Sequence, residues 1–105
     1  MERIFNITLH VPLGRRSGVL YLRQSQNAVS GTLETMGDKS ILTGVLSDDG
    51  RLYLEGSMHT PLRTFACRAE GQLTGRTLKL TVTGDRRPFC ITGEEAPAAK
   101  EAHRS

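Results

Sequence analysis

Arginines are the residues of this chain whose type and spacing are best suited to chemistry. Two adjacent pairs, Arg15 with Arg16 and Arg86 with Arg87, lie in glycine-containing segments that predict turns. The planar guanidinium group donates hydrogen bonds in pairs and suits phosphate or carboxylate. If both turns project from one end of the domain, the four side chains form an anion site; the alternative is that they are solvated loop tips. Further candidates for contact with this ligand are Arg63, Thr64 and Arg68.

Histidines and aspartates are weaker candidates. His10 and His59 both fall on the polar side of alternating segments, and only Glu55 lies near His59 on the same face. A metal or general-base site would need more groups than these, so we expect solvent-facing histidines and no metal site. Asp48 and Asp49 precede a glycine and lack the further oxygen ligands of a calcium loop, which indicates a plain turn.

The two cysteines give no further chemistry. Cys67 and Cys90 do not have the spacing of a zinc site, and with no export signal in the sequence we expect reduced thiols packed as small apolar side chains; a disulfide is the alternative. No Cys–His pair is expected on one face, and no nucleophile elbow, phosphate-binding loop or H-E-x-x-H motif occurs. We therefore expect no cofactor, and an enzyme is the least favoured class of function.

The elements that must carry these residues are β-strands. Apolar and polar residues alternate along most of the chain, as at Phe5, Ile7, Leu9 and Val11, and this period of two predicts half-buried strands. About eight such segments follow one another at intervals of 8–12 residues, as expected of a barrel or sandwich. No window predicts a helix of useful length. The predicted turns that separate the segments include residues 14–18, 26–27, 37–38, 48–50, 60–61 and 84–87.

A weak internal repeat supports closure into a barrel. Gly44-Val45-Leu46 followed by Leu52-x-Leu54-x-Gly56 is echoed by Gly71-Gln72-Leu73 followed by Leu78-x-Leu80-x-Val82-x-Gly84. These glycines fall in line with inward-facing positions, where a missing side chain lets a strand bend, and curved hairpins in series favour closure.

These hairpins resemble those of meander barrels of the avidin and lipocalin type. The resemblance covers roughly residues 28–93 and implies architecture alone, because the chain has no Trp, whereas lipocalins carry a G-x-W signature and avidins wall their ligand with Trp. We thus predict an all-β protein with an up-and-down antiparallel barrel over residues 1–93 and a disordered tail over residues 94–105. A two-sheet sandwich is the alternative fold.

Composition limits the class of protein, its binding partners and its expected location. The 105 residues are 37% hydrophobic and 24% charged, with a formal net charge of +3, as in an ordinary globular domain. The mild charge and the few aromatic residues make nucleic-acid binding unlikely. The alternating N-terminus does not predict a signal peptide, and no apolar run predicts a membrane span, so a cytoplasmic location is expected.

Two other classes of function are favoured over an enzyme. The first is a non-catalytic module that binds a small apolar or anionic molecule in the barrel or at its mouth; whether the barrel is filled or hollow stays open. The second is an interaction or structural subunit that self-associates through an exposed sheet face. The side chains expected to point outward on neighbouring strands and form this face are Tyr21, Ile41, Val45 and Tyr53.

Overall fold

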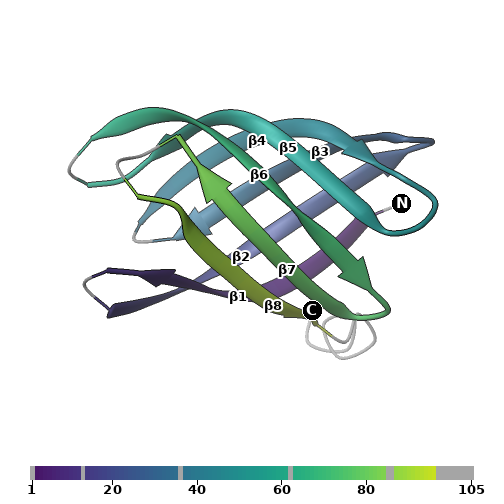
Figure 1. Cartoon of the computed structure of the whole chain (residues 1–105), viewed down its shortest axis with the longest axis horizontal. Helices are drawn as coiled ribbons and strands as arrows, with labels where there is room; N and C mark the ends of the chain where they lie inside the picture. The colour runs from purple at the N-terminus through teal and green to yellow at the C-terminus, as the bar shows by residue number, and fades with distance from the viewer. Residues whose placement is uncertain (1, 13, 36, 62, 85–86, 97–105) are drawn as a thin grey trace, which may run out of the picture.

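The computed structural model describes residues 2–12, 14–35, 37–61, 63–84 and 87–96, and these form eight antiparallel strands in one closed barrel (Figure 1). The prediction of an all-β meander is confirmed, and the sandwich alternative is wrong because β1 pairs with β8. The strands are β1 (Glu2–Val11), β2 (Gly14–Ser25), β3 (Ala28–Thr35), β4 (Asp38–Leu46), β5 (Arg51–His59), β6 (Thr64–Thr74), β7 (Thr77–Thr83) and β8 (Phe89–Glu95).

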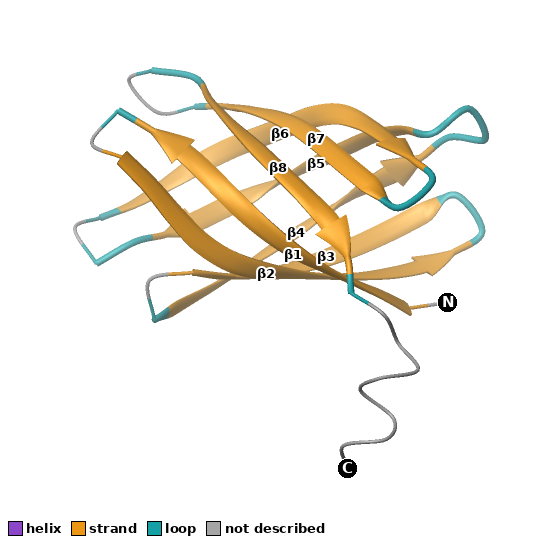
Figure 2. Ribbon diagram, turned by 90° about the horizontal axis from the view of Figure 1, so that it is seen from below, coloured by secondary structure: helices purple, strands orange, loops and turns teal. Residues whose placement is uncertain are grey.

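The connections between the strands gather at two opposite ends of the barrel (Figure 2). The β1–β2, β3–β4, β5–β6 and β7–β8 connections meet at one end, which we call the arginine end because it carries Arg15, Arg16, Arg63 and Arg87. The other connections and both ends of the described chain, Glu2 and Ala96, meet at the terminal end. The last strand includes residues 94 and 95, and residues 97–105 of the expected tail lie outside the described residues.

The interior is filled by the protein's own side chains. One hydrophobic cluster joins inward-facing side chains from all eight strands across the barrel. Leucines dominate this core, as the alternation predicts. The largest side chains that are almost completely buried belong to Phe5, Leu9, Leu20, Leu33, Leu52, Leu54, Met58, Leu78, Leu80 and Val82.

The repeated glycines lie where neighbouring strands come unusually close. A Cβ atom added to Gly44 would lie 1.7 Å from the carbonyl oxygen of Tyr53, and one added to Gly71 would lie 1.8 Å from that of Lys79. Gly44 pairs with Leu54 in the β4–β5 hairpin, and Gly71 pairs with Leu80 in the β6–β7 hairpin. The sequence repeat therefore corresponds to two hairpins that bend at equivalent points.

The first predicted turn is misplaced. Residues 14–18 belong to β2, and the chain turns earlier, between Val11 and Gly14, which face each other across the hairpin. Pro12 explains this position, because proline has no N–H for a strand ladder and its fixed φ suits a tight turn. Arg15 and Arg16 consequently lie on a strand rather than at a loop tip.

A candidate anion site at one end of the barrel

The predicted arginines are only partly brought together. Arg15 and Arg16 at the start of β2, Arg63 in the β5–β6 loop and Arg87 before β8 are all exposed at the arginine end. Arg86 lies outside the described residues. Arg68 lies elsewhere: it faces outward along the wall of β6, between Glu55 on β5 and Thr83 on β7.

Local contacts orient the arginines at this end. Arg16 Nη1 donates to the carbonyl oxygen of Arg15 at 3.1 Å. The Arg63 guanidinium lies 5.2 Å from the centre of the Phe65 ring, which is half-buried against the core at the mouth of the barrel. Thr60 fixes this loop, because its N–H and Oγ1 both donate to the carbonyl oxygen of Arg63, at 2.9 and 2.8 Å.

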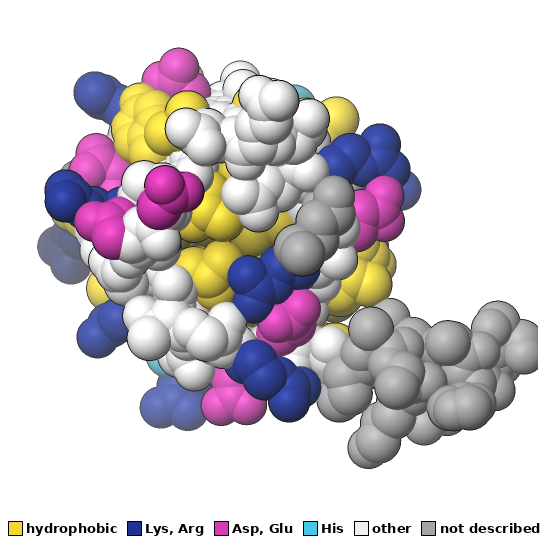
Figure 3. Space-filling view, turned by 90° about the vertical axis from the view of Figure 1, so that its right-hand side faces the viewer, with side chains coloured by type: hydrophobic (Ala, Val, Ile, Leu, Met, Phe, Trp, Pro, Cys, Tyr) yellow, Lys and Arg dark blue, Asp and Glu magenta, His cyan; other side chains and the backbone are white. Residues whose placement is uncertain are grey.

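The positive charge at the arginine end is poorly neutralised. At the terminal end, arginines are matched by carboxylates, with Arg3 to Glu95 at 2.7 Å and Arg23 to Glu2 at 2.6 Å. Figure 3 views this end and shows blue and magenta side chains next to one another around a yellow apolar centre. Among the described residues, Arg15, Arg16 and Arg87 form no ion pair. At the same end Lys39 pairs with Glu34 at 3.6 Å, whereas these three arginines have no carboxylate partner within the described part of the chain.

Within the described residues, the interior of the barrel offers no polar group that is free to bind a ligand. Thr35 and Ser40 are the buried polar side chains of the described core, and both are hydrogen-bonded to backbone groups. Thr35 Oγ1 donates to the carbonyl oxygen of Ser17 at 2.9 Å. Ser40 Oγ accepts from the N–H of His59 at 2.8 Å, bridging β4 and β5 beyond the last paired residues of that hairpin.

The histidines are exposed, as predicted. They lie on β1 and β5 at the arginine end and each contacts a nearby threonine: His10 Nε2 is 2.9 Å from Thr92 Oγ1, and His59 Nδ1 is 3.0 Å from Thr64 Oγ1. Nothing joins the two histidines into one site. Within the described ranges, no group of three or more His, Cys, Asp or Glu side chains could hold a metal ion.

One cysteine is placed differently from the prediction. Cys67 is buried and packs as a small apolar side chain, but Cys90 is exposed, so the two thiols lie on opposite faces of the barrel wall and both are free. Cys90 directly faces His10 across the β1–β8 pairing, and both side chains are exposed. The expectation that no Cys–His pair shares a face is therefore wrong. The expectation failed because Cys90 and His10 face each other only through the pairing of β8 with β1, whose register the sequence does not reveal.

The outer wall also carries a groove that the sequence did not indicate. It has a volume of about 860 Å³ and runs along β5, β6 and β7 beside the β4–β5 loop, with Val45, Tyr53, Glu70 and Lys79 among its lining residues. Because it combines an apolar surface with charges of both signs, it shows no preference for an anion.

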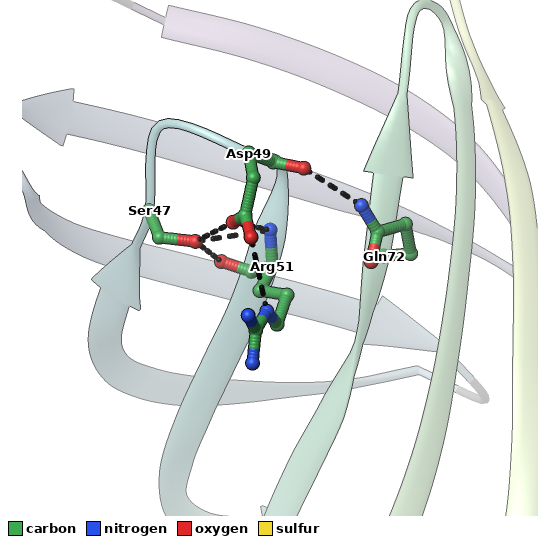
Figure 4. A network of polar contacts seen from close by, with 4 residues as sticks. All are labelled: Ser47, Asp49, Arg51 and Gln72. Carbon is green, nitrogen blue, oxygen red and sulfur yellow. Dashed lines mark hydrogen bonds and ion pairs between the residues drawn. The ribbon is translucent and has the colours of Figure 1, made fainter.

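The β4–β5 loop forms one rim of this groove and is held by a polar network (Figure 4). The Asp49 carboxylate accepts hydrogen bonds from Ser47 Oγ and from Nε of Arg51, and Gln72 Nε2 donates to the carbonyl oxygen of Asp49 at 2.8 Å. Hydrogen bonds to the Asp49 carboxylate from Ser47 Oγ, from the backbone N–H of Arg51 and from the Arg51 guanidinium, in that order of importance, lower the pKa of Asp49 to about 2. The predicted turn at residues 48–50 is confirmed, and its carboxylate is occupied by neighbours within the loop.

Comparison with known proteins adds no family: no family model, no curated protein and no solved structure matches this chain. Over the described residues, there is no helix long and apolar enough to cross a membrane. The geometry of the barrel and its surface is therefore the basis for assigning function.

Proposed function

We propose that this protein is a non-catalytic binding module that holds a small anionic ligand at the arginine end. The observation that carries the proposal is that Arg15, Arg16 and Arg87 lie exposed at the same end without an ion pair to any described residue. Guanidinium groups left without carboxylate partners favour multivalent anions, because such ligands can accept several charge-assisted hydrogen bonds at once.

The packed interior favours the mouth over the inside of the barrel as the place of binding. Avidin- and lipocalin-like barrels, which this chain resembles in architecture, can enclose one small ligand. Here leucines and Phe5 occupy the corresponding space as members of one buried cluster. An anion bound at the surface requires no interior room, whereas an enclosed apolar ligand would have to displace core side chains.

Calorimetric titration with pyrophosphate and citrate tests this proposal. We expect the double variant Arg15→Gln/Arg16→Gln to bind at least about tenfold more weakly, since each lost charge-assisted contact is worth on the order of 1.5–3 kcal/mol. The matched control is Arg23→Gln/Arg51→Gln, which removes equal charge at the terminal end and should bind like wild type. Absence of binding of both anions to the wild type, or equal binding by both double variants, would overturn the proposal.

Self-association is a second candidate, supported by unusually exposed apolar side chains. Ile41 and Val45 are 66% and 51% exposed on β4, and Tyr21 is 39% exposed and joined to Ile41 through Thr32 in one cross-strand row. Tyr53, the fourth expected member, faces Val45 but is half-buried, and its hydroxyl donates to Glu55 at 2.7 Å.

Light scattering after size exclusion tests this second function. If β4 forms an interface, the wild type elutes as a dimer or larger assembly, and Ile41→Lys/Val45→Lys elutes as a monomer. The control Thr81→Lys places a charge on an exposed position of β7. A wild-type monomer at the highest attainable concentration would exclude the interface.

A further inference from the structure

The outward faces of three neighbouring strands bring a thiol, an imidazole and a guanidinium into one row. Cys90 on β8 faces His10 on β1, and His10 faces Arg15 on β2. Directly facing side chains have Cβ atoms about 4.5–5.5 Å apart, and adjacent strands are about 4.8 Å apart, so Cys90 and Arg15 are separated by roughly 10 Å. All three side chains are exposed and lie near or at the arginine end.

The surroundings of Cys90 are suited to an anionic reaction partner. Among the described residues, Cys90 faces Thr81 on β7, and Thr92 lies two residues further along its own strand; neither carries a charge. The contact of His10 Nε2 with Thr92 Oγ1 holds the imidazole on the β8 side of its strand. Exposed thiols in positively charged surroundings are the ones that react, whereas buried thiols such as Cys67 are inert.

We propose that Cys90 is a site of thiol–disulfide exchange with small disulfides that carry carboxylates. The Cys90 proton passes to the His10 imidazole, and the resulting thiolate attacks one sulfur of the disulfide. A bond forms between that sulfur and Sγ of Cys90 while the original S–S bond breaks, and the other half leaves as a thiolate that takes up a proton. The Cys90 sulfur is oxidised, the leaving half is reduced, and Arg15 is a positioning residue that binds a carboxylate of the incoming molecule.

The proposal shares Arg15 with the proposed anion site but adds a covalent step, so the two can fail separately. Loss of exchange in Cys90→Ser with pyrophosphate binding intact would leave the anion site standing. Conversely, if the protein binds no pyrophosphate but Cys90 still reacts preferentially with an anionic disulfide, the thiol site alone would be supported.

Rates of adduct formation on the full chain, followed by intact-mass spectrometry, provide the test. The probes are oxidised glutathione, which is anionic, and cystamine, which is cationic. We expect the ratio of the two rates to be about tenfold higher for this protein than for the neutral thiol 2-mercaptoethanol, because fixed positive charge raises encounter with an anion. The adduct should map to Cys90 and be absent in Cys90→Ser.

Substitutions separate the roles of the two neighbours. Arg15→Gln should slow the reaction with oxidised glutathione and leave that with cystamine nearly unchanged, and the control Arg23→Gln at the terminal end should affect neither. His10→Asn should slow exchange with both disulfides, since it removes the proton acceptor. A rate ratio equal to that of 2-mercaptoethanol, or an adduct mapped to Cys67, would overturn the proposal. Wild-type behaviour of either variant would overturn the role assigned to that residue.

Discussion

The Arg3 guanidinium donates two hydrogen bonds to the Glu95 carboxylate across the seam where β1 meets β8. The distances are 3.1 Å from Nε to Oε2 and 2.7 Å from Nη2 to Oε1. Nη2 also donates to the carbonyl oxygen of Gly75 at 2.8 Å, and the guanidinium lies 5.3 Å from the centre of the Phe5 ring. This pair therefore joins the first strand, the last strand and the β6–β7 turn at the terminal end.

Neutralising Glu95 should weaken the closure of the barrel. We expect Glu95→Gln to lower the free energy of unfolding by about 1 kcal/mol at neutral pH, since the pair is bidentate but partly exposed. Urea denaturation followed by circular dichroism measures this difference. Glu94→Gln is the matched control, because Glu94 is exposed on the same strand, and it should change stability by less than about 0.5 kcal/mol.

The effect of Glu95 should depend on pH with a defined sign. Hydrogen bonds from Arg3 hold the pKa of the Glu95 carboxyl below its ordinary value of 4.5. Because the folded pKa is lower than the unfolded one, the stabilisation is fully present above pH 4.5 and is lost as the pH falls through the folded value. The difference between wild type and Glu95→Gln should therefore shrink in acid; a constant difference would contradict this assignment.

The bends at Gly44 and Gly71 should not tolerate a methyl group. Alanine at either position would place Cβ against the neighbouring backbone, so we expect each variant to lose about 2–4 kcal/mol or to fail to fold. Gly31→Ala is the control, because the nearest atoms there are the ends of Leu22 and Leu20 side chains at 3.2 and 3.3 Å. Thermal unfolding of the three variants would contradict the account if Gly31→Ala were the least stable.

The polar network of the β4–β5 loop can be checked by titration. Carboxyl ¹³C NMR should give a pKa of about 2 for Asp49, because hydrogen bonds from Ser47 and Arg51 favour its ionised form. In Ser47→Ala the pKa should rise toward the ordinary value of 3.8, since the largest cause of the shift is removed. An unchanged value in Ser47→Ala would show that the Ser47 contact does not form in solution.

The strand faces were predictable from sequence, whereas contacts across the closing seam were not. Alternation alone placed Leu52 and Leu54 inside and Ile41 outside, because side chains of a strand alternate between its two faces. The pairings of Cys90 with His10 and of Arg3 with Glu95 depend on the register of β1 against β8. These strands lie at opposite ends of the sequence, and no turn between them fixes that register.

The two cysteines should differ sharply in stability and reactivity. Cys67 is 5% exposed, and burial raises the pKa of its thiol, so it should react slowly with iodoacetamide in the folded protein. Cys67→Ser places a hydroxyl in the apolar core and should lower the free energy of unfolding by about 1–3 kcal/mol. Cys90→Ser, at an exposed position, should change it by less than about 0.5 kcal/mol. Alkylation mapped by peptide mass should label Cys90 first, and faster labelling of Cys67 would mean that the β5–β6 hairpin opens readily.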